Sequence, residues 1–434
     1  MSSDHSVVII REKPATPAPR TLWDARAALA GLSAVFLFEM LDNSILNVAL
    51  PTIGRELRAS TIELQWVTGA YAVVFGSLML PFGAIADRYG RRRVMLIGLV
   101  LLGLASLATA FVTTAPQLIG VRAVMGVAAA MTTPGSMALA FRLFDSDELR
   151  VRAITLISTV GLVGLALGPT AGGLALAVAP WQVLLLVNVP IAALAIIGIR
   201  LGIAPDAASE RHLDPVHPLR DLQLVAHPLV SSGLLFKTAA GLATAGLGYL
   251  VTLQLQLDWG WTPALAAIGM LPQVVVLVAG GAFVDPFVRR VGLERAGWIS
   301  SATVVAGLAV YTLFGRLGYP WVAAALVLVA AGMRVVGVVA GTNVLRGLPP
   351  NRTTIGAALT DTVSEVASAI GLAVAGTAIA ALFAGSIATA NWTVQQTAQF
   401  RDAVTIAGLI LTAGSGALVA WGIVRARRAA HPDE

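Results

Sequence analysis

The chain has 434 residues, of which 57% are apolar and 12% charged, and its formal net charge is +6. About a quarter of the residues of an ordinary soluble domain are charged, so this composition excludes a water-soluble globular protein and indicates one that lies in lipid. The absence of cysteine excludes disulfide bonds and thiolate metal sites. No Gly-x-x-x-x-Gly-Lys-Ser/Thr loop occurs, so the sequence offers no phosphate-binding site for ATP as an energy source.

In chain order, a polar tail (residues 1–26), in which we expect no removable signal peptide, precedes six apolar segments. A polar linker (204–227) separates them from six more, and a polar tail (425–434) ends the chain. A membrane-spanning helix needs about 20 apolar residues. The sequence therefore predicts an all-α integral membrane protein with twelve transmembrane helices, arranged as two six-helix pseudo-symmetric bundles (27–203 and 228–424). The expected spans are 27–50, 62–86, 94–112, 117–141, 153–176, 183–203, 228–256, 262–284, 296–315, 321–345, 354–384 and 402–424.

The positive charges are distributed very unevenly between the two sides that this count defines. With the N-terminus inside, the cytoplasmic segments carry 22 Lys or Arg residues and the external segments carry four. An added or missing span in mid-chain would destroy this bias. We therefore expect a multi-pass protein of a bacterial inner membrane with both termini in the cytoplasm. The basic charge then sets the topology and does not indicate a nucleic-acid partner.

A dense cationic turn joins the second and third spans, in the run Gly-Ala-Ile-Ala-Asp-Arg-Tyr-Gly-Arg-Arg-Arg. Gly83 and Gly90 allow close helix approach and a tight turn. Asp87 is an anion among arginines, so it can hold a charge latch that closes one face of the protein. These arginines are Arg88, Arg91, Arg92 and Arg93. A cationic loop that only sets orientation is the alternative, but it would not need this glycine and aspartate spacing.

A near copy of this turn begins at Gly281, and its Asp285 lies 198 positions after the first aspartate. Arg289 and Arg290 supply its positive charge. Pro286 stands where the first copy has an arginine, so we expect a weaker second latch. A charged hinge repeated at half the chain length is typical of a transporter.

The first hinge resembles the signature of the major facilitator superfamily, which implies the major facilitator fold. Span five contains Gly164-x-x-x-Gly168-Pro169-x-x-Gly172-Gly173, which resembles the antiporter motif that separates exporters from uptake symporters in that family. Glycines four apart also suit ordinary close helix packing, which is the alternative interpretation.

The end of span one, Leu41-Asp-Asn-Ser-Ile-Leu-Asn-Val-Ala-Leu-Pro51, resembles the first-helix motif of the drug:proton antiporter branch. Gln65-Trp66, Tyr71, Arg122 and Asn188-Val-Pro190 support this resemblance. In span eleven, Thr360-Asp361-Thr362 and Ser364-Glu365 are similar to the acidic patch of the quaternary-ammonium exporters. That branch usually has fourteen spans; here only the polar linker stands in place of the two central ones.

Four carboxylates lie in the interior of the predicted spans, away from the span ends, and a charge at mid-bilayer costs about 2.5–3.5 kcal/mol. Glu39 and Asp42 are three residues apart, and Asp361 and Glu365 are four apart, so each pair shares a helix face. Neighbouring carboxyl groups away from water suit proton exchange near neutral pH. Because all five histidines lie outside the apolar segments, an intramembrane proton carrier must be a carboxylate. Each acid is alternatively a salt-bridge partner that only fixes packing.

Three cations oppose these acids. Arg122 can reach Asp42, Asn43 or Asn47 if span four lies beside span one, as the family resemblance implies. Arg334 can meet an acid of span eleven, and Lys237 can extend to the nearer interface. With four acids against three bases, the expected cavity favours a cationic or neutral substrate.

These observations predict a secondary active transporter, not an enzyme: a monomeric proton-coupled antiporter that exports drugs or toxic amphipathic compounds by alternating access. It would need no cofactor or metal, because the proton gradient drives it. One alternative is a dedicated exporter of one endogenous metabolite or antibiotic. Another is a non-transporting receptor built on a transporter fold.

Overall fold

The computed structural model describes residue 19 and residues 21–205, 226–348, 353–384 and 392–430, and the regular secondary structure in these ranges is entirely helical. A backbone in hydrocarbon must satisfy its own hydrogen bonds, and a helix does so within one segment. Most of the predicted N-terminal tail and central linker lies outside the described residues.

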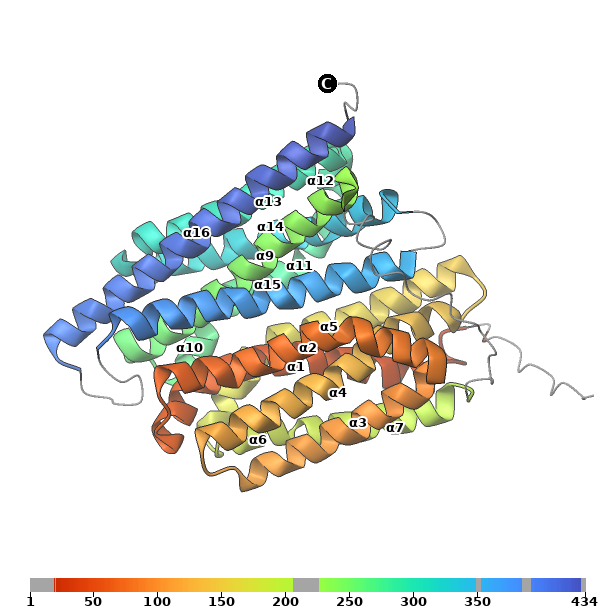
Figure 1. The fold of residues 1–434 in the computed structure, drawn as a ribbon, viewed down its shortest axis with the longest axis horizontal. Coiled ribbons are helices and arrows are strands. Elements are labelled where there is room, and N and C mark those ends of the chain that lie inside the picture. Colours follow the sequence, from red (N-terminus) through yellow and green to blue (C-terminus); the bar gives the residue numbers. More distant parts are fainter. Residues whose placement is uncertain (1–18, 20, 206–225, 349–352, 385–391, 431–434) are drawn as a thin grey trace, which may run out of the picture.

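The first half of the chain forms one helical bundle, drawn in red to yellow-green in Figure 1. Its helices correspond to the first six predicted spans, with α6 and α7 together forming the sixth. They are α1 (Arg26–Leu57), α2 (Thr61–Tyr89), α3 (Arg91–Ala108), η1 (Thr109–Phe111), α4 (Ala115–Arg142), α5 (Asp147–Leu176), α6 (Gln182–Leu186) and α7 (Asn188–Gly202).

The second half forms a second bundle, drawn in green to blue, that lies against the first (Figure 1). Its elements are α9 (Pro228–Leu253), η2 (Gln254–Asp258), α10 (Pro263–Gly269), α11 (Leu271–Ala279), α12 (Gly281–Val291), α13 (Leu293–Phe314), η3 (Gly315–Leu317), α14 (Tyr319–Arg346), α15 (Thr353–Leu382) and α16 (Val394–Ala430).

Eleven of the described helical segments are long and apolar enough to cross a membrane, and the bent pair α11–α12 raises the number to twelve if it counts as one span. The eighth predicted span is therefore not one continuous helix. Its axis turns by 62° between α11 and α12, at Gly280 and Gly281. Two successive glycines lower the cost of interrupting a helix, and Pro272 and Pro286 remove further backbone donors.

The start of α1 and the end of α16 lie at the same end of the molecule, as an even number of spans requires (Figure 1). We call this end the termini end and the opposite one the far end. The turns between α2 and α3 and between α12 and α13 lie at the termini end. Each turns at a glycine with positive φ, Gly90 (100°) and Gly292 (82°), which a side chain would strain.

Two helix starts at the far end, those of α2 and α4, have sequence-encoded caps. The Ser60 hydroxyl accepts the backbone N–H of Glu63 at 3.2 Å, and the Glu63 carboxylate accepts the Ser60 N–H at 2.8 Å. Thr114 and Gln117 form the same reciprocal box at the start of α4. Such caps satisfy donors that the first helical turn leaves without a partner.

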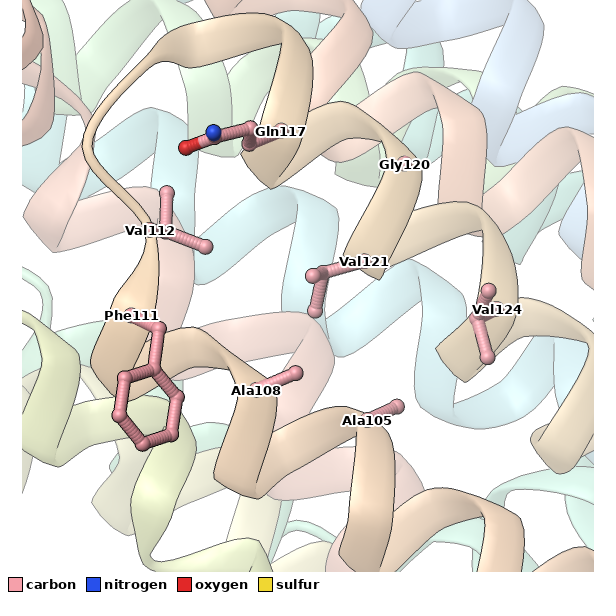
Figure 2. A pocket seen from close by; sticks show the side chains of 8 residues that line it. All are labelled: Ala105, Ala108, Phe111, Val112, Gln117, Gly120, Val121 and Val124. Carbon is pink, nitrogen blue, oxygen red and sulfur yellow. The ribbon is translucent and has the colours of Figure 1, made fainter.

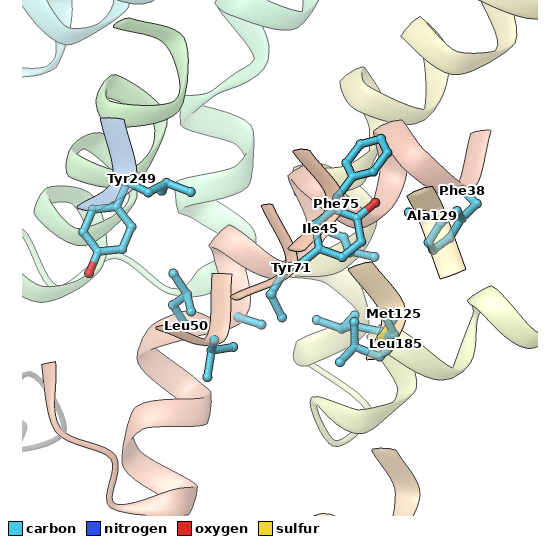
Figure 3. Close-up of a cluster of buried hydrophobic side chains, with 14 of the residues drawn as sticks. Phe38, Ile45, Leu50, Tyr71, Phe75, Met125, Ala129, Leu185 and Tyr249 are labelled. Carbon is cyan, nitrogen blue, oxygen red and sulfur yellow. The ribbon is translucent and has the colours of Figure 1, made fainter. Parts of the chain in front are cut away.

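The apolar core fills each bundle and continues between the bundles. Figure 3 shows this cluster, in which Phe38, Tyr71, Phe75 and Met125 pack inside the first half and Tyr249 comes from the second. Its members are aliphatic and aromatic side chains, with many alanines where helices approach closely, so burial of apolar area specifies how the helices meet.

Contacts between the two halves gather at the far end. The Gln65 amide of α2 donates to the Ala373 carbonyl of α15 at 3.1 Å. The Gln256 amide, beyond α9, donates to the Val48 carbonyl of α1 at 3.0 Å. On α5, a Cβ at Gly173 would lie 2.5 Å from the Pro263 carbonyl oxygen of α10. Neutral amides and close glycine packing thus join the halves at this end.

Candidate functional site

Three acidic side chains from the two halves form one electrostatic cluster near the middle of the bundle. The Glu39 carboxylate of α1 interacts electrostatically with Glu365 and Asp361 of α15. At 1.5 Å per residue, these positions lie about 12–20 Å along their helices from the termini end. The sequence paired each acid only with its neighbour on the same helix, and the fold joins both pairs across the interface.

The cation of this cluster is Lys237 of α9. Its ammonium group interacts electrostatically with both Asp361 and Glu365. The sequence assigned that role to Arg334, and this expectation was wrong: Arg334 instead lies against Gly281, where a Cβ would meet its Nη2 atom at 2.5 Å.

Close helix approach at two glycines brings α15 to its place. A Cβ at Gly76 of α2 would lie 3.0 Å from the Val366 side chain and 3.6 Å from that of Glu365. A Cβ at Gly241 of α9 would lie 3.0 Å from the Ser364 carbonyl oxygen. At this level α15 packs against α2 of the first half and α9 of its own half. A movement of one half relative to the other would therefore change the surroundings of Glu365.

Glu39 is buried, with 5% of its surface exposed. One of its oxygens accepts a hydrogen bond of 2.9 Å from the Thr133 hydroxyl of α4. Asp361 is exposed and Glu365 is partly exposed. The cluster therefore has an exposed edge on α15 and a buried edge on α1, an arrangement that gives ions access from one side.

Asp42 has a different environment, although it is one helical turn from Glu39. Its carboxylate pairs with the Arg122 guanidinium at 2.5 Å and accepts the Asn188 amide at 3.1 Å. Arg122 also donates to the Val67 carbonyl at 3.1 Å and stacks 4.4 Å from the Tyr71 ring centre. Asp42 and Arg122 are 0% and 2% exposed, so this is a fully desolvated ion pair.

The two groups of acids thus differ in charge balance. Asp42 has a full partner in Arg122, whereas the cluster of three acids contains one lysine, which interacts with Asp361 and Glu365. A cluster with more carboxylates than cations binds protons or positively charged ligands. Among the described side chains, Arg122 binds Asp42, which is one of its three expected partners. Asn47 is half-buried, and the Asn43 side chain lies outside what the structure describes.

The first hinge carries a local ion pair. Asp87 accepts the Arg91 Nε–H at 2.6 Å across the turn at Gly90, and Arg92 donates to the Arg200 carbonyl of α7 at 3.1 Å. Arg88 lies over the Tyr89 ring, and Gly83 packs near Pro134. These contacts tie α2, α3 and α7 together at the termini end.

The second hinge is not equivalent to the first. Asp285, Arg289 and Arg290 are exposed on α12, and they form no ion pair within the described chain. The turn itself falls at Gly292, seven residues after the aspartate instead of three. The expected second latch is therefore a short amphipathic helix, with its charges toward solvent.

The glycines of span five pack against the helix that carries Glu39 and Asp42. A Cβ at Gly164 would meet Leu37 at 2.8 Å, one at Gly168 would meet the Ser44 hydroxyl at 1.9 Å, and one at Gly172 would meet Ile45 at 2.7 Å. Pro169 is buried inside α5, which continues past it. Any side chain at these glycines would move α1 and its acids.

A pocket of about 500 Å³ lies between the end of α3 and the start of α4, and none of the acids of the site lines it. Figure 2 shows its lining of mainly apolar side chains, with Gln117 as the one polar member. Gln117 already caps α4 by accepting the Thr113 and Thr114 N–H groups. Because no charged residue lines this pocket, it is not a candidate site.

Sequence reasoning did not assign Thr133 or Asn188 to the site, and it gave Lys237 only an interfacial role. A signal existed for each: a hydroxyl, an amide or an ammonium group inside an apolar span is costly unless it has a partner. Residue type alone does not say which acid that partner is.

Comparison with known proteins agrees with this architecture. The family model described as Major Facilitator Superfamily matches residues 32–372. The chain belongs to the Major Facilitator Superfamily. It is an all-α, multi-pass membrane protein and a secondary transporter, not an enzyme.

Its relatives include named resistance and efflux proteins. It is 27% identical over 410 residues to the methyl viologen resistance protein SmvA of Salmonella typhimurium, covering 81% of this chain and 82% of that protein. It is 26% identical to the multidrug efflux pump LfrA of Mycolicibacterium smegmatis, with 89% and 87% covered. It is 27% identical to the cephamycin export protein CmcT of Amycolatopsis lactamdurans, with 81% and 84% covered.

Solved structures share the fold at low identity. A bacterial homologue of the human lysosomal transporter Spinster, in its inward-facing and occupied conformation, matches with a TM-score of 0.73 at 13% identity, over 92% of this chain and 96% of that one. The nucleoside transporter NupG matches with a TM-score of 0.69 at 13% identity, over 92% and 98%. The expected major facilitator fold is confirmed.

Proposed function

We propose that the chain is a proton-coupled antiporter that exports cationic or neutral amphipathic compounds across a bacterial inner membrane. The observation that carries this proposal is the surplus of carboxylates where the halves meet: Glu39, Asp361 and Glu365 interact with one another, and one lysine interacts with the last two. Resistance to methyl viologen and multidrug efflux, in the names of two relatives, support the direction and the charge of the cargo.

In this mechanism the cargo and the proton compete for the same acids. With the termini end facing the cytoplasm, cargo reaches the exposed Asp361 and the partly exposed Glu365 and displaces a proton from the cluster. The halves then rock about this level, so that the far-end contacts of Gln65 and Gln256 open and the termini end closes. Protons from outside reload the cluster and release the cargo.

Asp42 acts in this mechanism as an orienting residue. Its ion pair with Arg122 is satisfied on both sides and joins α1 to α4. We assign proton exchange to the cluster of Glu39, Asp361 and Glu365 and not to Asp42. No protein cofactor is needed, because each charge that crosses gains about 2.3 kcal/mol per 100 mV. The proposal includes a monomer with both termini in the cytoplasm.

Everted membrane vesicles test the proposal. With a proton gradient imposed, vesicles containing the protein should accumulate a cationic dye, and dissipating the gradient should release it. Glu365→Gln should reduce uptake of the cation more than export of a neutral drug. Equal losses for both cargoes would contradict the role assigned to Glu365.

A dedicated exporter of one compound is the second candidate. The similarity to the cephamycin export protein favours it, because that name specifies a single antibiotic. Expression in a pump-deficient bacterium separates the two. A multidrug pump should raise tolerance to several unrelated cations, whereas a dedicated pump should protect against none of them.

A further inference from the structure

Arg334 is a charged side chain inside the bundle that takes no part in the acidic cluster. It lies near the middle of α14, about 18 Å from Arg346 and about 22 Å from Tyr319 at 1.5 Å per residue. It makes no hydrogen bond or ion pair with another described residue, and its Nε atom is buried without a partner. Asp285, one helical turn beyond Gly281, does not pair with it.

The guanidinium group opens onto a groove of about 490 Å³ between α11, α12, α13 and α14. The other lining side chains are mostly apolar, and Ser300 and Thr303 supply the hydroxyls. Val275, Phe283 and Ile299 are 59%, 73% and 47% exposed on membrane-spanning helices, so the groove faces the bilayer. One unpaired cation thus lies at the wall of a groove that apolar molecules in the membrane can enter.

The bend in the eighth span produces this groove. The equivalent second span of the first half, α2, is one helix of 29 residues that packs tightly on α4: a Cβ at Gly126 would lie 2.7 Å from the Tyr71 carbonyl oxygen. In the second half, the 62° turn at Gly280 carries α12 away from the direction of α11. Gly281 then leaves room for the Arg334 guanidinium.

Charge and depth limit what can occupy the groove. An unpaired arginine at this depth costs several kcal/mol, and an anionic ligand offsets that cost. Since the hydrocarbon core is about 30 Å thick, Arg334 lies well below the headgroups, and a phospholipid phosphate cannot reach it without bringing its charge into hydrocarbon. A carboxylic acid can enter as the neutral species and release its proton to water when its carboxylate pairs with the guanidinium.

We propose that this groove is a lateral binding site for a lipophilic carboxylic acid. The carboxylate binds Arg334 in the two-pronged geometry that a guanidinium offers, and the hydrocarbon chain lies along Val275, Phe283 and Ile299. This site is separate from the acidic cluster, because its charge is positive and its opening is toward lipid. It gives the transporter a second ligand class, opposite in charge to the proposed cargo.

Saturation binding of radiolabelled dodecanoic acid to the purified full-length protein in neutral detergent tests this site. Wild type should bind it saturably, and unlabelled acid, but not dodecanol of the same chain length, should displace it. Arg334→Gln should weaken binding at least tenfold, whereas Arg334→Lys should retain part of it. Arg346→Gln, which removes an exposed arginine of the same helix, is the matched control and should bind as wild type does.

The second variant, Phe283→Gln, changes an exposed side chain and keeps the test valid if Arg334→Gln fails to fold. It should weaken binding of the acid and leave the protein's elution profile unchanged. If dodecanol displaced the labelled acid as effectively as unlabelled acid does, the groove would bind apolar chains without using the Arg334 guanidinium. Displacement by a short-chain anionic phospholipid as effective as that by the acid would show a lipid headgroup site. Unchanged affinity in both variants would exclude the groove, and each of these three results overturns the proposal.

Discussion

Removing the Arg122 guanidinium tests the desolvated ion pair most strongly. Arg122→Gln leaves the Asp42 carboxylate fully buried, with the Asn188 amide as its remaining described partner. Breaking a buried pair in this way costs about 3–5 kcal/mol, because an uncompensated charge stays in a low-dielectric site. The substitution also removes the hydrogen bond to the Val67 carbonyl and the stacking on Tyr71. We therefore expect a large fall in thermal stability of the purified protein.

The paired substitution separates charge from packing. Asp42→Asn with Arg122→Gln removes both charges and leaves no carboxylate buried without its cation, so the double variant should be more stable than Arg122→Gln alone. Arg152→Gln is the control: its pair with Glu148 is 62% and 73% exposed, so its loss should cost only about 0.5 kcal/mol.

Thermal unfolding followed by tryptophan fluorescence measures five proteins in one detergent: wild type, the single variants Arg122→Gln and Asp42→Asn, the double variant, and Arg152→Gln. A double variant whose loss equals or exceeds the sum of the single losses would refute the reasoning, because the two residues would then not be energetically coupled. Equal losses for Arg122→Gln and Arg152→Gln would also refute it, because burial would then have no effect.

Three further predictions concern glycines. Gly168→Ala should lower the melting temperature, because its Cβ would lie 1.9 Å from the Ser44 hydroxyl oxygen. Such overpacking costs about 1–3 kcal/mol of stability. Adding Ser44→Gly removes the clash and should restore most of the lost stability. Gly90→Ala should destabilise by about 1–3 kcal/mol, because φ is 100° there. Gly173→Cys with Ala267→Cys should form a disulfide that holds the far end closed, so oxidant should stop transport and reductant should restore it. The two Cβ positions are 2.8 Å apart, so α5 and α10 must separate by ~1 Å to reach the ~3.8 Å spacing of a disulfide. The natural chain has no cysteine to compete.

Gly69→Ala is the matched control for the two alanine substitutions, because no atom lies within 4 Å of its Cβ position. Its melting temperature should stay at or above that of wild type. A loss at Gly69 as large as at Gly168 or Gly90 would contradict the packing and strain arguments. Transport by the oxidised cysteine pair at the wild-type rate would contradict the assignment of the far end as a gate.

Much of the architecture could be predicted from the sequence, because a bilayer imposes simple rules. Span length, the distribution of arginine and the repeated hinge predict the two bundles, and the structure and the family match agree with them. The break in the eighth span was not predicted. Gly280 and Gly281 were visible, but paired glycines also occur in continuous helices, so only packing decides that the axis turns there.

The sequence identified most of the charged residues of the site, but it did not identify which acid contacts which base. Charged residues are rare enough in apolar spans that Glu39, Asp42, Glu365 and Arg122 could be selected from the sequence. Which acid meets which base depends on helix rotation, and a rotation of one residue is 100° on a helix. That dependence explains why Lys237, and not Arg334, faces the acids of α15.

The contacts between the halves at the far end were even harder to predict from the sequence. Gln256 lies in a π-helical turn, and a single amide near a helix end is an ordinary feature of a polar boundary. Its hydrogen bond to Val48 joins residues 208 positions apart, and neither neighbouring sequence indicates it. Long-range contacts between the halves need the folded geometry.

Purified protein reconstituted in liposomes, with a pH-sensitive dye inside, tests the exchange of protons for cargo most directly. Adding a cationic substrate on one side should drive protons the opposite way, and an imposed pH difference should drive the substrate. Glu365→Gln should weaken both couplings for this cation, and Arg346→Gln should leave them unchanged. Substrate movement that ignores the pH difference in the wild-type protein would contradict the account.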